Sequence, residues 1–212
     1  MSPVLLNSLA SSTLTLCLIF FLTAVLSLPL GLLVAFGRMS RFKLLSEPVR
    51  FYQLVMRGTP LILQLMFVYF APYYIFGFSF KRFTACIVGF TINYAAYFAE
   101  IYRGGIASIP KGQYEAGRVL GFSQRQTFLR IILPQVIKGI LPPMGSEFMT
   151  LVKDTALASV IAVPEVFRVA SSAASRSFST WPLVYAGVIY FLLNYIVEFS
   201  FHFAEKKLDY YR

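Results

Sequence analysis

Two carboxylates within an apolar stretch are the residues best suited to chemistry. Glu147 and Asp154 are seven positions apart, which is about two helical turns, so both lie on one face of a helix. An ionised group inside a membrane-spanning helix costs roughly 2.5–3.5 kcal/mol on insertion scales, and it usually faces the bundle interior or a wet cavity. The pair therefore predicts either a transport path or structural ion pairs, for instance between Lys153 and a carboxylate on a neighbouring helix.

A second polar set lies in the apolar stretch 83–102, as a stripe made of Asn93, Tyr94, Tyr97 and Glu100. Glu100 is either a path residue or the partner of Arg57 or Arg103. Arg57, at the entrance of another apolar stretch, either belongs to the path or extends its charged end to the membrane interface. The residues alone leave these alternatives open.

The chain lacks the common catalytic and metal-binding patterns. It has no Gly-x-x-x-x-Gly-Lys-Ser/Thr phosphate loop and no His-Glu-x-x-His. Its one histidine, His202, lies near the end of the last apolar stretch, where an interfacial role is expected. Cys17 and Cys86 lie inside apolar stretches, so neither a disulfide nor a metal is indicated. We predict that the chain is not an enzyme and holds no metal or cofactor of its own.

Composition and hydropathy define the elements that must position these residues. The 212 residues are 58% hydrophobic and only 13% charged, with a mean hydropathy of +0.69. A soluble domain carries about 25% charged residues. We predict an all-α membrane protein, one transmembrane domain over 1–212, with about five spans. The expected spans are 11–37, 60–78 (or an interrupted helix that starts earlier), 83–102, 136–163 and 181–204. Pro29 and Gly31 indicate a bend or close packing in the first span.

Basic residues decide whether 136–163 is a span, because its charges make it weak by hydropathy alone. With five spans, 13 lysines and arginines lie on one side, four lie on the other, and Arg57 and Lys153 lie within spans. Without this span the asymmetry weakens. The positive-inside rule therefore favours five spans, with the N-terminus outside and the C-terminus in the cytoplasm. The same rule accounts for the net charge of +10, so we expect no nucleic-acid partner.

The segment 113–134, between the third and fourth spans, is then cytoplasmic. Its helix-capping and helix-breaking residues predict two short helices. The first, about 113–120, ends at Gly121, which can adopt the left-handed cap conformation. The second begins at Ser123, and Gln126 three residues later completes a capping box. Pro134 ends this helix or begins the next element. The segment is either an ordinary folded loop or a docking surface for another protein.

A complete spacing match favours the docking surface. Glu115-Ala116-Gly117, Gly121 and Ile131-x-Leu133-Pro134 resemble the Glu-Ala-Ala motif of the membrane subunits of bacterial ABC importers. The chain departs from that motif only at Gly117, where alanine is usual. A glycine is expected to loosen the first short helix by roughly 1 kcal/mol.

Further motifs are similar to one branch, the polar amino-acid permeases. They are Arg57-Gly58-Thr59-Pro60, Ala99-Glu100-Ile101-Tyr102-Arg103-Gly104-Gly105-Ile106, Ser108-Ile109-Pro110-Lys111-Gly112-Gln113 and Lys153-Asp154-Thr155-Ala156-Leu157. The branch often has serine at Ala156. The resemblance extends from about Leu14 to the C-terminus.

The resemblance implies a subunit of a type I importer in the bacterial inner membrane, surrounded by lipid. It implies a second permease subunit, identical or paralogous, an extracytoplasmic binding protein that delivers an amino acid, and a separate ATPase subunit that holds ATP and magnesium. The coupling residues would be Glu115, Ala116, Gly117, Gly121, Ile131, Leu133 and Pro134. The candidate substrate path comprises Arg57, Tyr97, Glu100, Glu147, Asp154 and Thr155.

Two other classes of function compete with this one. A stand-alone secondary transporter or channel could use the intramembrane carboxylates for coupling to protons or cations. Five spans without a recognisable repeat are a poor match to repeat-built transporters. The third class is an assembly subunit with no path of its own. The sequence does not name the amino acid.

Overall fold

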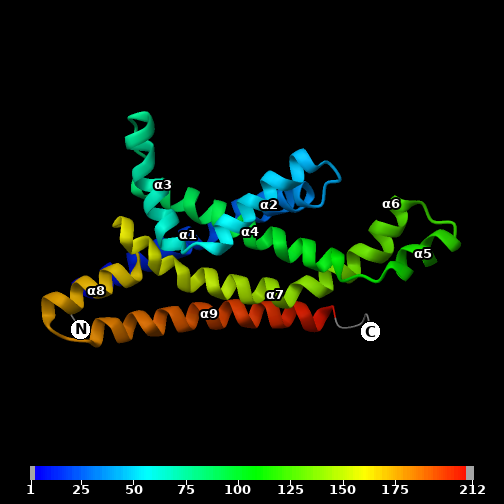
Figure 1. Cartoon of the computed structure of the whole chain (residues 1–212). Coiled ribbons are helices and arrows are strands. Elements are labelled where there is room, and N and C mark those ends of the chain that lie inside the picture. The colour runs from blue at the N-terminus through cyan, green and yellow to red at the C-terminus, as the bar shows by residue number, and fades with distance from the viewer. Residues whose placement is uncertain (1–2, 209–212) are drawn as a thin grey trace.

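The computed structural model describes residues 3–208, and within them every regular element is helical (Figure 1). Arg212, counted above among the basic residues, and both ends of the predicted 1–212 domain lie outside this range. The elements are α1 (Pro3–Arg38), α2 (Lys43–Gly58), α3 (Leu61–Phe76), α4 (Arg82–Ala107), α5 (Lys111–Val119), α6 (Gln124–Thr127), a π-helical turn (Phe128–Ile132), α7 (Leu133–Asp154), a 3-10 helix (Thr155–Ile161), α8 (Val166–Ser177) and α9 (Trp181–Lys207).

Three helices are long and apolar enough to cross a membrane unaided: α1, α4 and α9. Two further spans are possible by length and composition if each of two bent pairs is one span. The first pair is α2 with α3, bent by 111°, and the second is Gln124–Ile161 with α8, bent by 58°. The described part of the chain therefore holds three to five candidate spans. The second expected span consists of two helices that meet at a sharp corner, as the interrupted-helix alternative required.

The long helices form an elongated bundle (Figure 1). α4 packs against α1, α3 and α7, and α9 packs along α7. The start of α1 lies beside α8 at one end of the bundle, whereas α5, α6 and the end of α9 lie at the other. α3 projects away from the bundle. The first and last described residues therefore lie at opposite ends of the bundle.

α4 supplies the centre of the core. Phe90, Tyr94 and Phe98 on this helix are fully or almost fully buried. Gly31 of α1 lies directly on them: a methyl group added there would lie 3.0 Å from the Phe98 Cβ and 3.1 Å from the Ala95 carbonyl oxygen. The prediction of close packing in the first span is therefore confirmed. Small residues allow membrane helices to approach in this way.

The end of α7 differs from the expected fourth span, 136–163. The α-helix stops at Asp154 and continues as the 3-10 helix to Ile161, before a turn leads into α8. α8 was not predicted, and its N-terminal cap is the fully buried Glu165. This carboxylate accepts hydrogen bonds from the backbone N–H groups of Phe167 at 2.7 Å and Arg168 at 2.6 Å, and from the Tyr190 hydroxyl at 2.7 Å. A side-chain acceptor at this position satisfies the free donors of the first turn.

Candidate functional site

The segment 113–134 folds largely as its local signals predict. α5 begins two residues earlier than expected, at Lys111, and ends at Val119. Gly121 has a φ of +76°, in the left-handed region that favours glycine. The Ser123 hydroxyl accepts from the Gln126 N–H at 3.3 Å, and the Gln126 side chain accepts from the Ser123 N–H at 2.9 Å. The capping box is thus present.

The second short helix is not a separate element. After four α-helical residues, α6 passes through the π-helical turn into α7, and Pro134 lies in the first turn of α7. A proline lacks the N–H that an α-helix needs in its interior but is tolerated in a first turn. Of the two alternatives for Pro134, the structure has the one in which it begins the next element.

Gly117 has a packing role that the sequence did not indicate. The glycine is buried, and a methyl group at its Cα would lie 2.6 Å from both Cγ2 and Oγ1 of Thr127. α5 therefore lies closely on α6 at this point. The expected loosening of α5 concerns only the conformational freedom of the glycine backbone. The contact with Thr127, in contrast, holds α5 against α6.

The outer face of α5 carries an exposed apolar tip. Val119 is 88% exposed and Leu120 70% exposed, and Glu115 and Ala116 beside them are also exposed. Ile131, by contrast, is half-buried, as are its motif neighbours Leu133 and Pro134. The motif thus divides into an accessible part on α5 and a part that packs at the start of α7.

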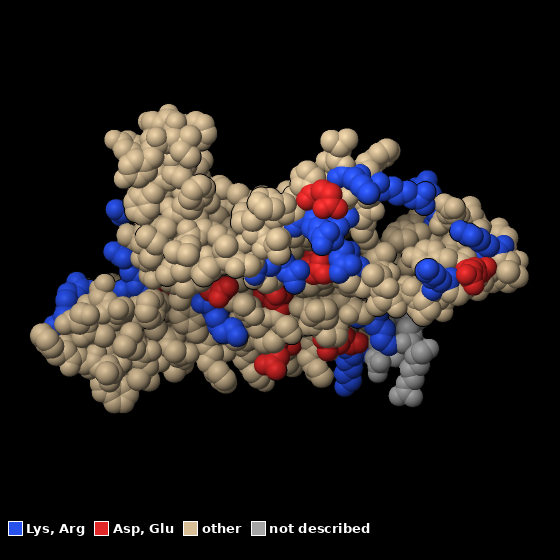
Figure 2. All heavy atoms as spheres, viewed as in Figure 1, with Lys and Arg blue, Asp and Glu red and all other residues tan. Residues whose placement is uncertain are grey.

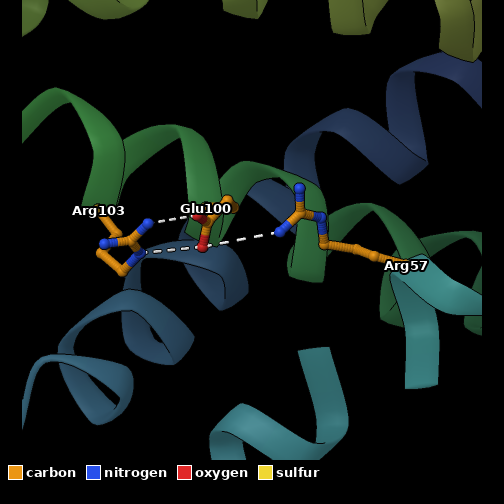
Figure 3. Close-up of polar contacts among 3 residues, drawn as sticks. All are labelled: Arg57, Glu100 and Arg103. Atoms are coloured by element: carbon orange, nitrogen blue, oxygen red, sulfur yellow. Dashed lines mark hydrogen bonds and ion pairs between the residues drawn. The ribbon is translucent and has the colours of Figure 1, made fainter. Parts of the chain in front are cut away.

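Ion-pair, hydrogen-bond and ring contacts connect four of the candidate path residues: Arg57, Tyr97, Glu100 and Asp154. Figure 3 shows Glu100 on α4 between Arg103 of the same helix and Arg57 of α2. Arg103 donates from Nε to Glu100 Oε2 at 3.0 Å and from Nη2 to the other carboxylate oxygen. Arg57 Nη1 lies 3.7 Å from Glu100 Oε2, and its guanidinium carbon is 5.6 Å from the centre of the Tyr97 ring. Glu100 thus pairs with both arginines, one tightly and one loosely.

α7 continues this chain of contacts. The Tyr94 hydroxyl donates to Asp154 Oδ2 at 2.8 Å, and the Tyr94 ring is 6.2 Å from that of Tyr97. Glu147 lies on the same helix, about two turns before Asp154. Arg57 of α2 is thus connected through the Tyr97 and Tyr94 rings of α4 to Asp154 of α7, with a cation at one end of this chain and a carboxylate at the other.

Thr155 and Lys153 lie apart from this cluster. Thr155 is fully buried, and its hydroxyl donates to the Val152 carbonyl at 2.7 Å. Lys153 is exposed and has no carboxylate within 4 Å among residues 3–208. The structure thus connects four of the six path candidates. In the same range, no cluster of three or more histidine, cysteine or acidic residues could hold a metal ion.

Gln64 is a structural residue of this site that the sequence did not single out. Its amide nitrogen donates to the carbonyls of Met56 at 3.0 Å and Thr59 at 3.1 Å, which the corner between α2 and α3 leaves free. Asn93 of α4 donates to the Met56 carbonyl at 3.1 Å and to the Gln64 side-chain oxygen at 2.9 Å. The two amides fix the corner that carries Arg57. The sequence feature that could have indicated this role is a glutamine one helical turn after Gly58-Thr59-Pro60, which interrupts the helix.

The family model described as "Binding-protein-dependent transport system inner membrane component" matches residues 27–210. The L-cystine transport system permease protein TcyB of Bacillus subtilis is 36% identical over 192 residues, which cover 90% of this chain and 82% of TcyB. The arginine transport system permease protein ArtQ of the same organism is 38% identical over 191 residues, 90% of this chain and 87% of ArtQ.

Solved structures agree with the sequence comparisons. A crystal structure of an amino acid ABC transporter with histidines superposes with a TM-score of 0.85 at 33% identity, covering 97% of this chain and 94% of that one. The methionine ABC transporter MetNI, in an inward-facing form, superposes with a TM-score of 0.77 at 20% identity over 98% and 99% of the two chains, which shows a shared fold. The chain belongs to the family of inner membrane components of binding-protein-dependent transport systems.

Proposed function

We propose that the chain is the transmembrane subunit of an ATP-driven importer that carries a polar amino acid across the bacterial inner membrane. Its relatives TcyB and ArtQ are named as permeases for cystine and arginine, and they cover nine-tenths of the chain. The proposal includes an extracytoplasmic binding protein, a second permease subunit, and an ATPase subunit that holds the ATP and magnesium. The N-terminus lies outside and the C-terminus in the cytoplasm.

The exposed tip of α5 is the observation that carries the proposal. Val119 and Leu120 project from a segment with otherwise polar surroundings, and a partner that covers them removes apolar surface from water. Behind the tip, Gln124–Ile161 runs as one continuous helical rod. α7 alone has 22 residues, or about 33 Å at 1.5 Å per residue. A push on α5 by the ATPase therefore reaches Asp154 at the far end of α7.

The charge arrangement suits a zwitterionic substrate. An α-carboxylate binds at Arg57, whose present partner Glu100 is 3.7 Å away and is also held by Arg103. An α-ammonium binds at Glu147 and Asp154. Guanidinium groups favour carboxylates because their donors match both oxygens. The face of the Tyr97 ring borders the path. Thr155 acts indirectly, because its hydroxyl donates to the Val152 carbonyl and so stabilises the end of α7.

Reconstitution tests the proposal directly. The chain is expressed with the ATPase, the binding protein and any second permease encoded beside it, purified as a complex, and placed in proteoliposomes. Uptake that needs internal ATP and the binding protein, and that vanadate blocks, is the expected result. Uptake by the chain alone, driven by a proton gradient, would show instead a secondary transporter.

A further inference from the structure

A basic hollow lies between α1, α2 and α4, where its lining includes Arg38, Arg50 and Glu100. Figure 2 shows lysine and arginine side chains gathered over α2 and the adjoining part of the bundle, around a few acidic ones. The hollow has a volume of about 530 Å³, and its lining includes Arg38, Arg50, Arg57 and Arg103, against the single carboxylate of Glu100. Its electrostatic character is therefore strongly positive.

Two of the four arginines are already engaged. Arg57 and Arg103 both pair with Glu100, so their charges are partly neutralised there. Arg38, at the end of α1, lines the hollow on one side. Arg50 of α2 has one weak partner, the exposed Glu47 at 3.9 Å. Arg38 has no carboxylate within 4 Å among residues 3–208. Arg38 and the weakly paired Arg50 are thus the cations of the hollow most available to an added anion.

A buried donor points to the same place. Gln53 lines the hollow, is only 5% exposed, and its side-chain nitrogen has no hydrogen-bond partner in the described part of the chain. Buried polar groups in native proteins are almost always paired, so an unpaired one calls for an explanation. An anion in the hollow would accept from this amide as well as from the guanidinium groups.

The neighbourhood indicates that the anion belongs to a lipid. Phe51 and Leu54 of α2 are 67% and 69% exposed, and Leu54 also lines the hollow. α4 runs from Arg82 to Arg103 over 21 steps, about 32 Å at 1.5 Å per residue, which matches the hydrocarbon thickness of about 30 Å. With the proposed orientation, the hollow therefore lies at the headgroup level of the inner leaflet. Basic pockets between helices on the cytoplasmic side are suited to lipid headgroups.

We propose that this hollow binds the phosphate of an anionic phospholipid headgroup, held by Arg38, Arg50 and the Gln53 amide, with an acyl chain along Phe51 and Leu54. The hollow shares Arg57 and Glu100 with the candidate substrate path. The residues proposed to hold the phosphate, Arg38, Arg50 and Gln53, do not belong to that path. Binding here fixes α2 to the end of α1 and to α4. The lipid site does not depend on the substrate, since it is measured without transport or ATP.

Binding of short-chain lipids to the purified full-length chain tests this site. Dioctanoyl phosphatidylglycerol is titrated in detergent and followed by thermophoresis. The unaltered protein should bind it saturably, and the double substitution R38Q/R50Q should weaken binding at least tenfold. The charge-matched control R41Q/K43Q removes two exposed cations from the same side of the membrane, outside the hollow, and should change the dissociation constant by less than twofold.

Further measurements distinguish a lipid phosphate from free phosphate and control for misfolding of the variants. Inorganic phosphate should compete only weakly; equal affinity for it would replace the lipid assignment with a site for free phosphate. Gln53→Leu should weaken lipid binding two- to fivefold while the protein stays monodisperse. If R38Q/R50Q does not fold, R38Q and R50Q are each compared with R41Q. Equal losses in the hollow and control variants, or no saturable binding, would overturn the proposal.

Discussion

Asp154→Asn is the sharpest test of the substrate path. The substitution removes a charge and keeps the size of the side chain. The asparagine oxygen can still accept the hydrogen bond that Tyr94 donates at 2.8 Å, so the fold should hold. Only an interaction that needs the negative charge is lost.

The size of the loss follows from the geometry. An ammonium 4 Å from the carboxylate gains about 4 kcal/mol at an effective dielectric constant of 20. Asp154 is half-buried, so solvent screening lowers this figure, and a hydrogen bond to a charged group contributes about 1.5–3 kcal/mol net. At 1.4 kcal/mol for each factor of ten, the rate of uptake at low substrate should fall about 10- to 100-fold.

The assay is ATP-driven uptake of the amino acid by proteoliposomes, at loaded binding-protein concentrations well below saturation. The matched control is Glu198→Gln, which removes the same charge from an exposed position on α9 and should retain near-normal uptake. If Asp154→Asn and Glu198→Gln transport equally well, Asp154 has a structural role and the proposed anionic side of the path is wrong.

Two further substitutions test the frame that holds the site. Gln64→Leu removes the donor to the Thr59 carbonyl at 3.1 Å and leaves the Met56 carbonyl with Asn93 as its side-chain donor. It should destabilise the protein by about 1–3 kcal/mol, measured by thermal unfolding in detergent; an unchanged midpoint would contradict this role of the corner. Gly31→Leu forces α1 away from α4 and should cost about 1–3 kcal/mol, whereas Gly187→Leu, with no atom within 4 Å, should cost little; equal effects would refute the close-packing argument.

Signals that act within a few residues could be predicted from the sequence. The left-handed Gly121 and the Ser123–Gln126 capping box depend only on neighbouring backbone groups, and both are present. The grouping of Glu147 with Asp154 needed only the helical repeat. The long apolar stretches predicted α1, α4 and α9, because hydropathy is a property of the local sequence and does not depend on tertiary contacts.

Features that depend on distant partners could not be predicted in this way. Gln64 acts together with Asn93, 29 positions later, and neither residue alone indicates the pairing. α8 is short and polar, and its buried cap, Glu165, is completed by Tyr190 of α9. The same limit applies to Gly117, since the contact with Thr127 exists only after α5 has folded back onto α6.

The central claim is that the exposed face of α5 receives the force of ATP hydrolysis, and Glu115→Lys tests it most directly. The variant is reconstituted with its partner subunits, and ATP hydrolysis stimulated by the loaded binding protein is measured beside uptake. Glu205→Lys near the end of α9 is the charge-matched control. Glu115→Lys should insert normally but lose both stimulated hydrolysis and uptake, while Glu205→Lys should keep them. Normal coupled hydrolysis and uptake by Glu115→Lys would contradict the claim.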